Sequence, residues 1–186
     1  MKKIPTIYVR DWAGDARYVT QEPDPACDWV FAGEGKPTRK YDGTCVRFDG
    51  RRWWARREVK PGRPEPGGFE LAGEDAQTGK RIGWEPADGT GFHRFLLEAA
   101  GPEPGDWLAG TYELCGPKIN QNPEGYPGHR LVRHDAAAPV EVSALTWDAI
   151  RAVVLAIADD EGAEGIVWHH GDGRMAKVKA RDFRRA

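Results

Sequence analysis

The feature that most constrains the fold is a pair of strand-like runs joined by an Asp-Gly turn. Cys45-Val46-Arg47-Phe48 alternates in polarity, Asp49-Gly50 supplies a tight turn, and the run from Arg52 to Glu58 returns as a partner strand. Two runs joined by so short a turn pair as an antiparallel hairpin. The sequence therefore predicts that antiparallel sheet forms at least part of the fold.

A lysine stands directly ahead of this hairpin, in the string Lys40-Tyr41-Asp42-Gly43-Thr44. This order predicts an amine in a loop just before a rigid strand, which suits a covalent nucleophile. Asp-Gly is also common turn chemistry, so the alternative is an exposed lysine ahead of a hairpin. The return strand would bring Arg56 or Arg57 near the substrate of Lys40. The alternative for each arginine is a solvated charged strand end.

Length and charge limit the function classes. A chain of 186 residues can bury one sizeable core, so we expect residues 1–186 to form a single domain, and we expect a monomer. The net charge of −2 excludes a basic coat, and any nucleic-acid contact must use a local patch.

The sequence also bears on the compartment. The longest apolar run, from Ala152 to Ala158, is far too short to cross a bilayer, and no signal-peptide apolar region follows the N-terminus. The three cysteines, Cys27, Cys45 and Cys115, are scattered and lack metal-ligand spacing. We therefore expect a reduced, cytoplasmic protein with no membrane partner.

Several further elements are predicted from local patterns. Ile4, Ile7 and Val9 indicate one strand, and Trp29-Val30-Phe31 indicates another. Thr90 is expected to cap a short helix that carries Phe92, Phe95, Leu96 and Ala99 on one face and ends at Gly101-Pro102. Thr146 is expected to cap a longer helix that ends at Gly162.

A second chemically interesting segment is the strand from Gly110 to Gly116. If Tyr112 and Leu114 face the core, Glu113 stands alone on the other face and points toward solvent or a cleft. A further strand, Leu131-Val132-Arg133, follows a long polar connection. His129 and His134 have no partner at metal-ligand spacing, so neither is assigned a role.

The third segment is a strand headed by a carboxylate, Glu164-Gly165-Ile166-Val167-Trp168, followed by a second run from Arg174 to Ala180. Period two places Ala176, Val178 and Ala180 on one face and Lys177 with Lys179 on the other. Two neighbouring lysines repel each other unless they face solvent or an anion. The alternative is an exposed edge strand that its lysines protect against aggregation.

Taken in order, these segments resemble the motifs of covalent nucleotidyltransferases, a superfamily that includes DNA ligases, RNA ligases and mRNA capping enzymes. More narrowly, the chain resembles the small single-domain ATP-dependent RNA ligases, which join a 5′-phosphate to a 3′-hydroxyl. The segments that carry the resemblance are Lys40-Tyr41-Asp42-Gly43, Arg56-Arg57-Glu58-Val59-Lys60-Pro61-Gly62, Thr78-Gly79-Lys80, Tyr112-Glu113-Leu114, Gly116-Pro117-Lys118-Ile119-Asn120-Gln121-Asn122-Pro123-Glu124-Gly125, Glu164-Gly165-Ile166-Val167 and Lys177-Val178-Lys179.

The resemblance implies an α+β nucleotidyltransferase fold of antiparallel sheets around an ATP cleft, with helices outside. Lys40 would attack the α-phosphate of ATP and hold AMP, and Lys177 and Lys179 would neutralise the charge that grows on that phosphate. Glu164 and Glu113 would hold Mg²⁺ or Mn²⁺. The residues implied to bind ATP are Arg39, Lys40, Arg56, Arg57, Glu113, Lys177 and Lys179.

This chemistry requires an unprotonated amine, although an ordinary lysine has a pKa of about 10.4. Desolvation and nearby cations would lower that pKa toward neutrality. Only seven residues follow Lys179, so we expect no OB-fold domain of the kind that DNA ligases and capping enzymes carry. The aromatic residue that stacks on adenine is left unassigned, since Tyr112 is expected to face away from Glu113.

The substrate implied by the resemblance is a broken RNA strand. A basic C-terminal stretch and the arginines of the hairpin would contact the phosphates of the RNA, which predicts weak, salt-dependent RNA binding. The implied role is RNA repair. The alternatives are a DNA ligase-like enzyme, another adenylyltransferase, and a nucleic-acid-binding module without catalysis. The basic residues are Arg51, Arg52, Arg56, Arg57, Arg174, Lys177, Lys179, Arg181, Arg184 and Arg185.

Overall fold

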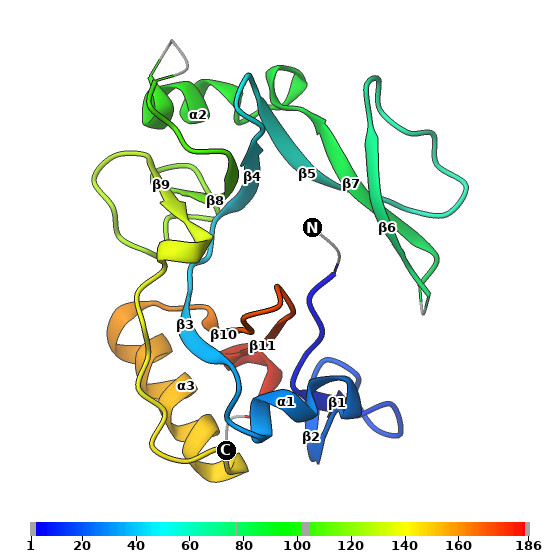
Figure 1. Cartoon of the computed structure of the whole chain (residues 1–186), viewed down its shortest axis with the longest axis vertical. Helices are drawn as coiled ribbons and strands as arrows, with labels where there is room; N and C mark the ends of the chain where they lie inside the picture. The colour runs from blue at the N-terminus through cyan, green and yellow to red at the C-terminus, as the bar shows by residue number, and fades with distance from the viewer. Residues whose placement is uncertain (1–2, 77, 102–104, 185–186) are drawn as a thin grey trace. The chain divides into compact units, whose positions relative to one another are not determined.

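The computed structural model describes residues 3–76, 78–101 and 105–184. It combines antiparallel sheets with a few helices, as expected for the α+β class (Figure 1). The chain packs as two compact units. Unit 1 contains residues 42–136 and the N-terminal residues up to Lys3, and unit 2 contains residues 4–41 and 137–186. That the two units act as one domain remains a prediction.

Unit 2 is built on a three-stranded antiparallel sheet in the order β11-β10-β3, with a separate pair of short strands, β1 and β2. The helices and strands of unit 2 are β1 (Tyr8–Arg10), β2 (Val19–Pro23), α1 (Asp28–Phe31), β3 (Lys36–Lys40), α3 (Trp147–Glu161), β10 (Gly165–His169) and β11 (Met175–Lys179). Short 3-10 turns stand at Pro25–Cys27 and Ala180–Asp182.

The two faces of this sheet differ in polarity. Ile166 and Val178 are fully buried in the core of unit 2, where they join Ile150 and Val154 of α3. Ala176 is buried with them, whereas Lys177 and Lys179 alternate with these residues and are only partly buried. The predicted separation of apolar and basic residues along β11 is therefore confirmed.

The helix α3 begins and ends where its sequence signals predict. The hydroxyl of Thr146 accepts a hydrogen bond from the backbone N–H of Ala149, and Gly162 is the C-cap. This arrangement supplies partners to backbone groups that a helix end leaves unsatisfied.

Two predictions for the start of the chain are wrong. Trp29, Val30 and Phe31 lie in the helix α1 and not in a strand, because Asp24 caps a 3-10 turn that leads directly into α1. The strand predicted from Ile4 to Val9 is shorter, and only Tyr8–Arg10 forms β1. Ahead of β1, the backbone of Pro5 and Ile7 bonds to Lys177, so this segment follows the edge of β11.

Unit 1 contains a six-stranded antiparallel sheet in the order β6-β7-β5-β4-β8-β9. The elements of unit 1 are β4 (Thr44–Phe48), β5 (Trp53–Val59), β6 (Glu70–Asp75), β7 (Lys80–Pro86), α2 (His93–Ala100), β8 (Gly110–Cys115) and β9 (Arg130–Arg133). The hairpin predicted at Asp49-Gly50 is confirmed, since Phe48 pairs with Trp53 across it. The strands β6 and β7 were not predicted.

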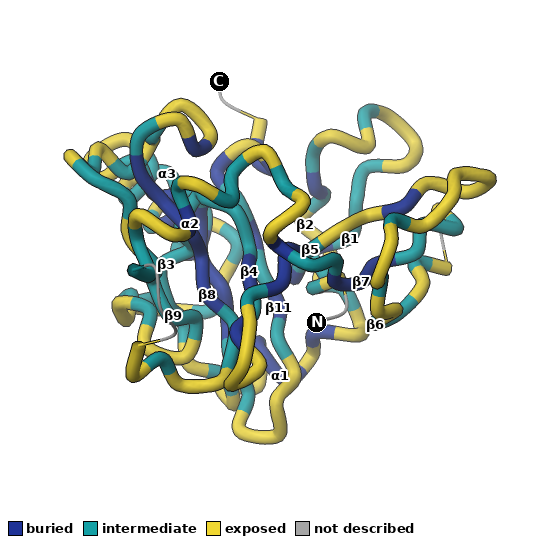
Figure 2. The backbone as a smooth tube through the Cα atoms, turned by 90° about the horizontal axis from the view of Figure 1, so that it is seen from above, coloured by how far each residue is buried: buried dark blue, intermediate teal, exposed yellow. Residues whose placement is uncertain are grey.

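The core of unit 1 lies on one face of this sheet, under α2. Val46, Phe48, Tyr112 and Leu114 are buried there with Leu96 of the helix. Figure 2 shows the burial along β4 and β8. The predicted apolar face of α2 is confirmed, because its other members pack against the same cluster; they are Phe92, Phe95 and Ala99.

The predicted N-cap of α2 is wrong. The hydroxyl of Thr90 donates to the carbonyl oxygen of Ala87, at 2.7 Å, within a preceding 3-10 turn, and the helix begins only at His93. Gly101 is the C-cap as predicted, whereas Pro102 lies outside the described residues. Among the described residues, none of the helices combines the length and apolar character that crossing a bilayer requires.

Candidate functional site

Lys40 is the last residue of β3, and not part of a loop ahead of a strand. It pairs with Gly165 of β10. The β3 sequence contains a proline and two lysines, so local propensity gives little sign of a strand there. The pairing with β10, which lies far along the chain, makes this segment extended. The position of Lys40 is therefore fixed by sheet hydrogen bonds.

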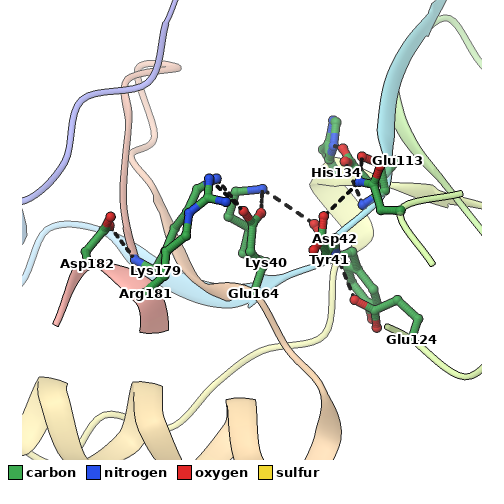
Figure 3. Close-up of polar contacts among 12 residues, drawn as sticks. Lys40, Tyr41, Asp42, Glu113, Glu124, His134, Glu164, Lys179, Arg181 and Asp182 are labelled. Carbon is green, nitrogen blue, oxygen red and sulfur yellow. Dashed lines mark hydrogen bonds and ion pairs between the residues drawn. The ribbon is translucent and has the colours of Figure 1, made fainter. Parts of the chain in front are cut away.

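Three cationic side chains converge on the carboxylate of Glu164 (Figure 3). The Nζ atom of Lys40 lies 2.5 Å from Oε2. Lys179 donates to Oε1, and a guanidinium nitrogen of Arg181 lies 3.5 Å from the same oxygen. The side chains of Lys40, Lys179 and Glu164 are only 17%, 14% and 11% exposed, whereas that of Arg181 is 74% exposed. The two lysines are thus largely removed from solvent and share one anion.

The sheet register explains why these residues meet. Gly165 is directly opposite both Lys40 and Lys179. The backbone N–H of Glu164 donates to the carbonyl oxygen of Lys40 at 2.9 Å. The carbonyl oxygen of Glu164 accepts from the backbone N–H of Ala180 at 3.0 Å. A Cβ atom at position 165 would lie 2.1 Å from the carbonyl oxygen of Val178, so only glycine permits this close approach.

The charges act on one another. Burial alone would raise the pKa of Glu164, but the ammonium groups of Lys40 and Lys179 outweigh it and lower that pKa below its ordinary value. Burial lowers the pKa of Lys179; the Glu164 carboxylate opposes this shift, while Lys40 and Arg181 add to it. Glu164 is therefore ionised at neutral pH and balances part of a strongly positive cluster.

A buried aspartate fixes the end of β11. Asp182 is 2% exposed, accepts a hydrogen bond from the backbone N–H of Lys179 at 2.9 Å, and forms an ion pair with Arg10 at 2.8 Å. These bonds hold the backbone on which the Lys179 side chain stands. Sequence reasoning did not identify Asp182, because its partner Arg10 lies at the other end of the chain.

Two other predicted ATP-binding residues of unit 2 lie on opposite faces of the sheet. Lys177 stands opposite Val167 on the face that carries Lys40 and Lys179. Arg39 stands on the other face, where it binds the carboxylate and the carbonyl oxygen of Glu161 at the end of α3, at 2.5 and 2.6 Å. The structure thus brings Lys177 to the cluster's face of the sheet and gives Arg39 a partner in the helix.

In unit 1, Glu113 lies on the sheet face opposite Tyr112, as predicted. It is 8% exposed, and its Oε2 atom lies 2.9 Å from Nε2 of His134. Its Oε1 atom accepts from the backbone N–H of Gly43 at 3.2 Å. Tyr112 is buried in the core, with its hydroxyl donating to the carbonyl oxygen of Leu108. His134, which the sequence left unassigned, is therefore a member of the Glu113 site.

The Lys-x-Asp-Gly motif spans the division between the units, since Lys40 and Tyr41 belong to unit 2 and Asp42 to unit 1. In unit 1, the side-chain amide of Asn120 donates to Asp42 Oδ1 and to the carbonyl oxygen of Gly43, both at 2.8 Å. The Glu124 carboxylate accepts from the Asp42 N–H at 2.9 Å (Figure 3). The loop from Gly116 to Gly125 thus positions the Asp-Gly turn.

Strand alternation separates Arg56 from Arg57. Arg56 pairs with Trp84 and lies on the sheet face that carries Cys45 and Glu113, whereas Arg57 lies on the other face. Their nearest carboxylates also differ: Arg56 lies 3.5 Å from Glu58, and Arg57 lies 3.7 Å from Glu85. Arg56 is therefore the better candidate for a ligand contact on the Glu113 face.

Comparison with known proteins gave no family assignment. No protein-family model matches the chain, and no curated protein sequence matches it significantly.

Proposed function

We propose that this protein is an ATP-dependent RNA ligase that works through a covalent lysyl-AMP. The observation that carries the proposal is the convergence of Lys40, Lys179 and Glu164, three residues of separate motifs, at one point of the unit 2 sheet. A solvated surface lysine would need neither a buried carboxylate nor a second buried lysine. The protein would act as a cytoplasmic monomer in RNA repair.

The cluster suits a nucleotide because it contains more positive than negative charge. Lys40, Lys179 and Arg181 surround the single carboxylate of Glu164. A triphosphate would supply anionic oxygens to these side chains in a partly dehydrated setting, where charge-assisted hydrogen bonds are strongest. Arg181, which is mostly exposed, could move to such a ligand at little cost.

In the first step the Lys40 nitrogen attacks the α-phosphorus of ATP. A phosphorus–nitrogen bond forms, the bond to the bridging oxygen breaks, pyrophosphate leaves, and the amine proton passes to solvent. Glu164 at 2.5 Å favours the charged form of Lys40, so the amine becomes reactive when this ion pair is broken. Lys179, with Lys177 on the same sheet face, would stabilise the charge that develops on the phosphate.

Glu164 offers the hard oxygen donors that Mg²⁺ or Mn²⁺ prefers, and such an ion would polarise the phosphate oxygens. Binding of the ion by Glu164 would also release Lys40 from its carboxylate partner. In the later steps a 5′-phosphate oxygen of RNA takes the AMP from Lys40, and a 3′-hydroxyl then displaces AMP to close the strand.

The predicted RNA-binding arginines of unit 2 have carboxylate partners. Arg174 pairs with Asp172 at 2.7 Å, and Arg184 pairs with Asp11 at 2.8 Å, in exposed positions. Exposed ion pairs contribute little, so a phosphate could replace either carboxylate. We expect weak binding that falls steeply with salt. Arg185 lies outside the described residues.

The proposal is tested with ATP labelled on its α-phosphate and with matched RNA and DNA strands at low salt. We expect label on the protein, and sealing of 5′-phosphorylated RNA well above sealing of DNA, because DNA lacks the 2′-hydroxyl. Equal sealing of DNA would favour a DNA ligase-like enzyme. Labelling of the protein without any sealing would favour another kind of adenylyltransferase. A protein that takes no label but binds RNA would be a nucleic-acid-binding module.

A further inference from the structure

One face of the unit 1 sheet carries a thiol, a carboxylate and an imidazole side by side. They belong to Cys45, Glu113 and His134, and their potential ligand atoms all lie within 4.8 Å of one another. A sulfur, an oxygen and a nitrogen donor at this spacing match the donor types that Zn²⁺ uses in proteins. We propose that these residues bind a borderline-soft divalent cation of the Zn²⁺ class, an ion separate from the one assigned to Glu164.

The register of three neighbouring strands creates the group. Cys45 of β4 is directly opposite Glu113 of β8, which is directly opposite Val132 of β9. His134 follows just after β9 ends, at the start of a 3-10 turn (His134–Ala136), and its Nε2 atom lies 2.9 Å from the Glu113 carboxylate. Each ligand comes from a different chain segment, and the sheet hydrogen bonds hold the three segments in place.

Hydrogen bonds to other groups orient the side chains of His134 and Glu113. The Nδ1 atom of His134 lies 2.9 Å from the hydroxyl oxygen of Thr111, which leaves Nε2 directed at Glu113. The second oxygen of Glu113 accepts from the backbone N–H of Gly43. Metal-binding histidines and carboxylates are commonly oriented by such outer hydrogen bonds. A Cβ atom at Gly43 would lie 2.9 Å from Cγ of Glu113, so glycine leaves room for this approach.

The charge of the group also points to a cation. Glu113 is 8% exposed, and among the described residues His134 is its only ion-pair partner. A nearly buried carboxylate without lysine or arginine is costly unless another positive charge is present. A divalent cation bound by the Cys45 thiolate, the Glu113 carboxylate and a neutral His134 would give a site with no net charge.

The donor set also distinguishes this ion from magnesium. Mg²⁺ prefers oxygen ligands, whereas thiolate and imidazole favour Zn²⁺ and Co²⁺. The resemblance implied that Glu113 shares the catalytic ion with Glu164, but its neighbours here are sulfur and nitrogen donors. On binding, the ion replaces the thiol proton of Cys45, which passes to solvent, and a water would complete the tetrahedron. This inference does not depend on the proposed ligase activity.

The test uses Co²⁺ as a coloured substitute for Zn²⁺ on the reduced full-length protein after treatment with a chelator. We expect one equivalent of Co²⁺ to bind with a near-ultraviolet thiolate-to-cobalt absorption, to be displaced by Zn²⁺, and to resist a large excess of Mg²⁺. Cys45→Ser should abolish this absorption. Thr111→Val should weaken Co²⁺ binding by about 10- to 100-fold, as expected when an outer partner of a ligand is lost.

Variants of the other ligands and thiols make the test specific. Glu113→Gln and His134→Ala should weaken binding more than Thr111→Val does, and circular dichroism would establish that each remains folded. Cys115→Ser and Cys27→Ser should bind Co²⁺ like the parent protein. Absence of the thiolate absorption at millimolar Co²⁺ would overturn the proposal. The same holds if Cys45→Ser keeps the absorption, if Cys115→Ser loses it, or if His134→Ala binds normally.

Discussion

The polar groups of the two units are built alike but have opposite chemical character. In each, a nearly buried carboxylate contacts side chains of the sheet face opposite the hydrophobic core: Glu164, just before β10, in unit 2, and Glu113, within β8, in unit 1. Glu164 is surrounded by two lysines and an arginine, whereas Glu113 has a histidine and a nearby cysteine. The first group therefore carries an excess of cationic side chains, whereas the second places a carboxylate beside nitrogen and sulfur donors.

We propose that this difference in neighbours gives the two carboxylates different chemical roles. The ammonium groups around Glu164 keep it ionised by lowering its pKa against the effect of burial, and in the proposed function their excess positive charge would bind phosphate. The imidazole of His134 and the thiol of Cys45 are the other donors of the metal site that we propose at Glu113. The predictions below test the comparison, beginning with the largest expected effect.

The strongest test of the unit 2 group is Lys40→Ala. We expect complete loss of covalent AMP labelling, because no other group at that position can form the phosphorus–nitrogen bond, while the protein stays folded. The matched control is Lys36→Ala, at the exposed start of the same strand, which should label normally. The measurement is gel detection of protein-bound label after incubation with ATP and Mg²⁺. Undiminished labelling of Lys40→Ala would remove Lys40 from the mechanism.

Lys179→Ala tests whether the second lysine serves a developing phosphate charge. Loss of one such donor lowers the rate by about 100- to 1000-fold, and we expect a comparable fall in the rate of adenylylation. Because Lys179→Ala leaves Lys40 as the ammonium partner of Glu164, we expect the variant to stay folded, although it loses the contribution of one nearly buried ion pair. Lys177→Ala makes the same test for the other lysine on this sheet face, and we expect a fall in the same rate. Full activity combined with aggregation of both variants would instead support the edge-strand role.

The pH dependence of stability tests the charge balance at Glu164. Its folded pKa lies below its ordinary value of about 4.3, so its stabilising contribution is complete above that value and is lost as the pH falls below it. Glu164→Gln should therefore lose less unfolding free energy than the parent between about pH 5 and pH 2. Urea unfolding at each pH gives the comparison.

A carboxylate of unit 1 provides the matched control for this measurement. Hydrogen bonds from the Arg52 backbone and from the Trp54 indole help lower the pKa of Asp49 to about 2, so Asp49→Asn should reduce the acid dependence chiefly near the lower end of the range. If Glu164→Gln and the parent give parallel curves, the ion pairs at Glu164 contribute nothing to stability.

The smallest effect is expected for Asn120→Ala, which removes two hydrogen bonds to Asp42 and Gly43. Because Asn120 is exposed, we expect a loss of about 1 kcal/mol of unfolding free energy. Gln121→Ala is the control, because Gln121 has a positive φ of 66°, close to the φ of 46° of Asn120, so that alanine meets similar backbone strain at both positions. Equal losses in both variants would assign the effect to backbone strain and not to the hydrogen bonds.

Local patterns predicted the elements whose signals are short in range. The hairpin at Asp49-Gly50, the caps of α3 and the two faces of β11 all follow from residues a few positions apart, and the structure contains them. The order of motifs likewise selected Lys40, Glu164 and Lys179 for attention. In the structure, the side chains of Lys40 and Lys179 both contact the carboxylate of Glu164.

Tertiary structure decided what depends on partners distant in sequence. Lys40 ends a strand because β10 pairs with it, and Trp29 lies in a helix because the turn before it is capped by Asp24. His134 has no metal-ligand partner close by in sequence, but sheet register brings it to Glu113 and Cys45. Periodicity along a chain fixes which face a residue takes within a strand, whereas hydrogen bonding between strands fixes which residues share that face as neighbours.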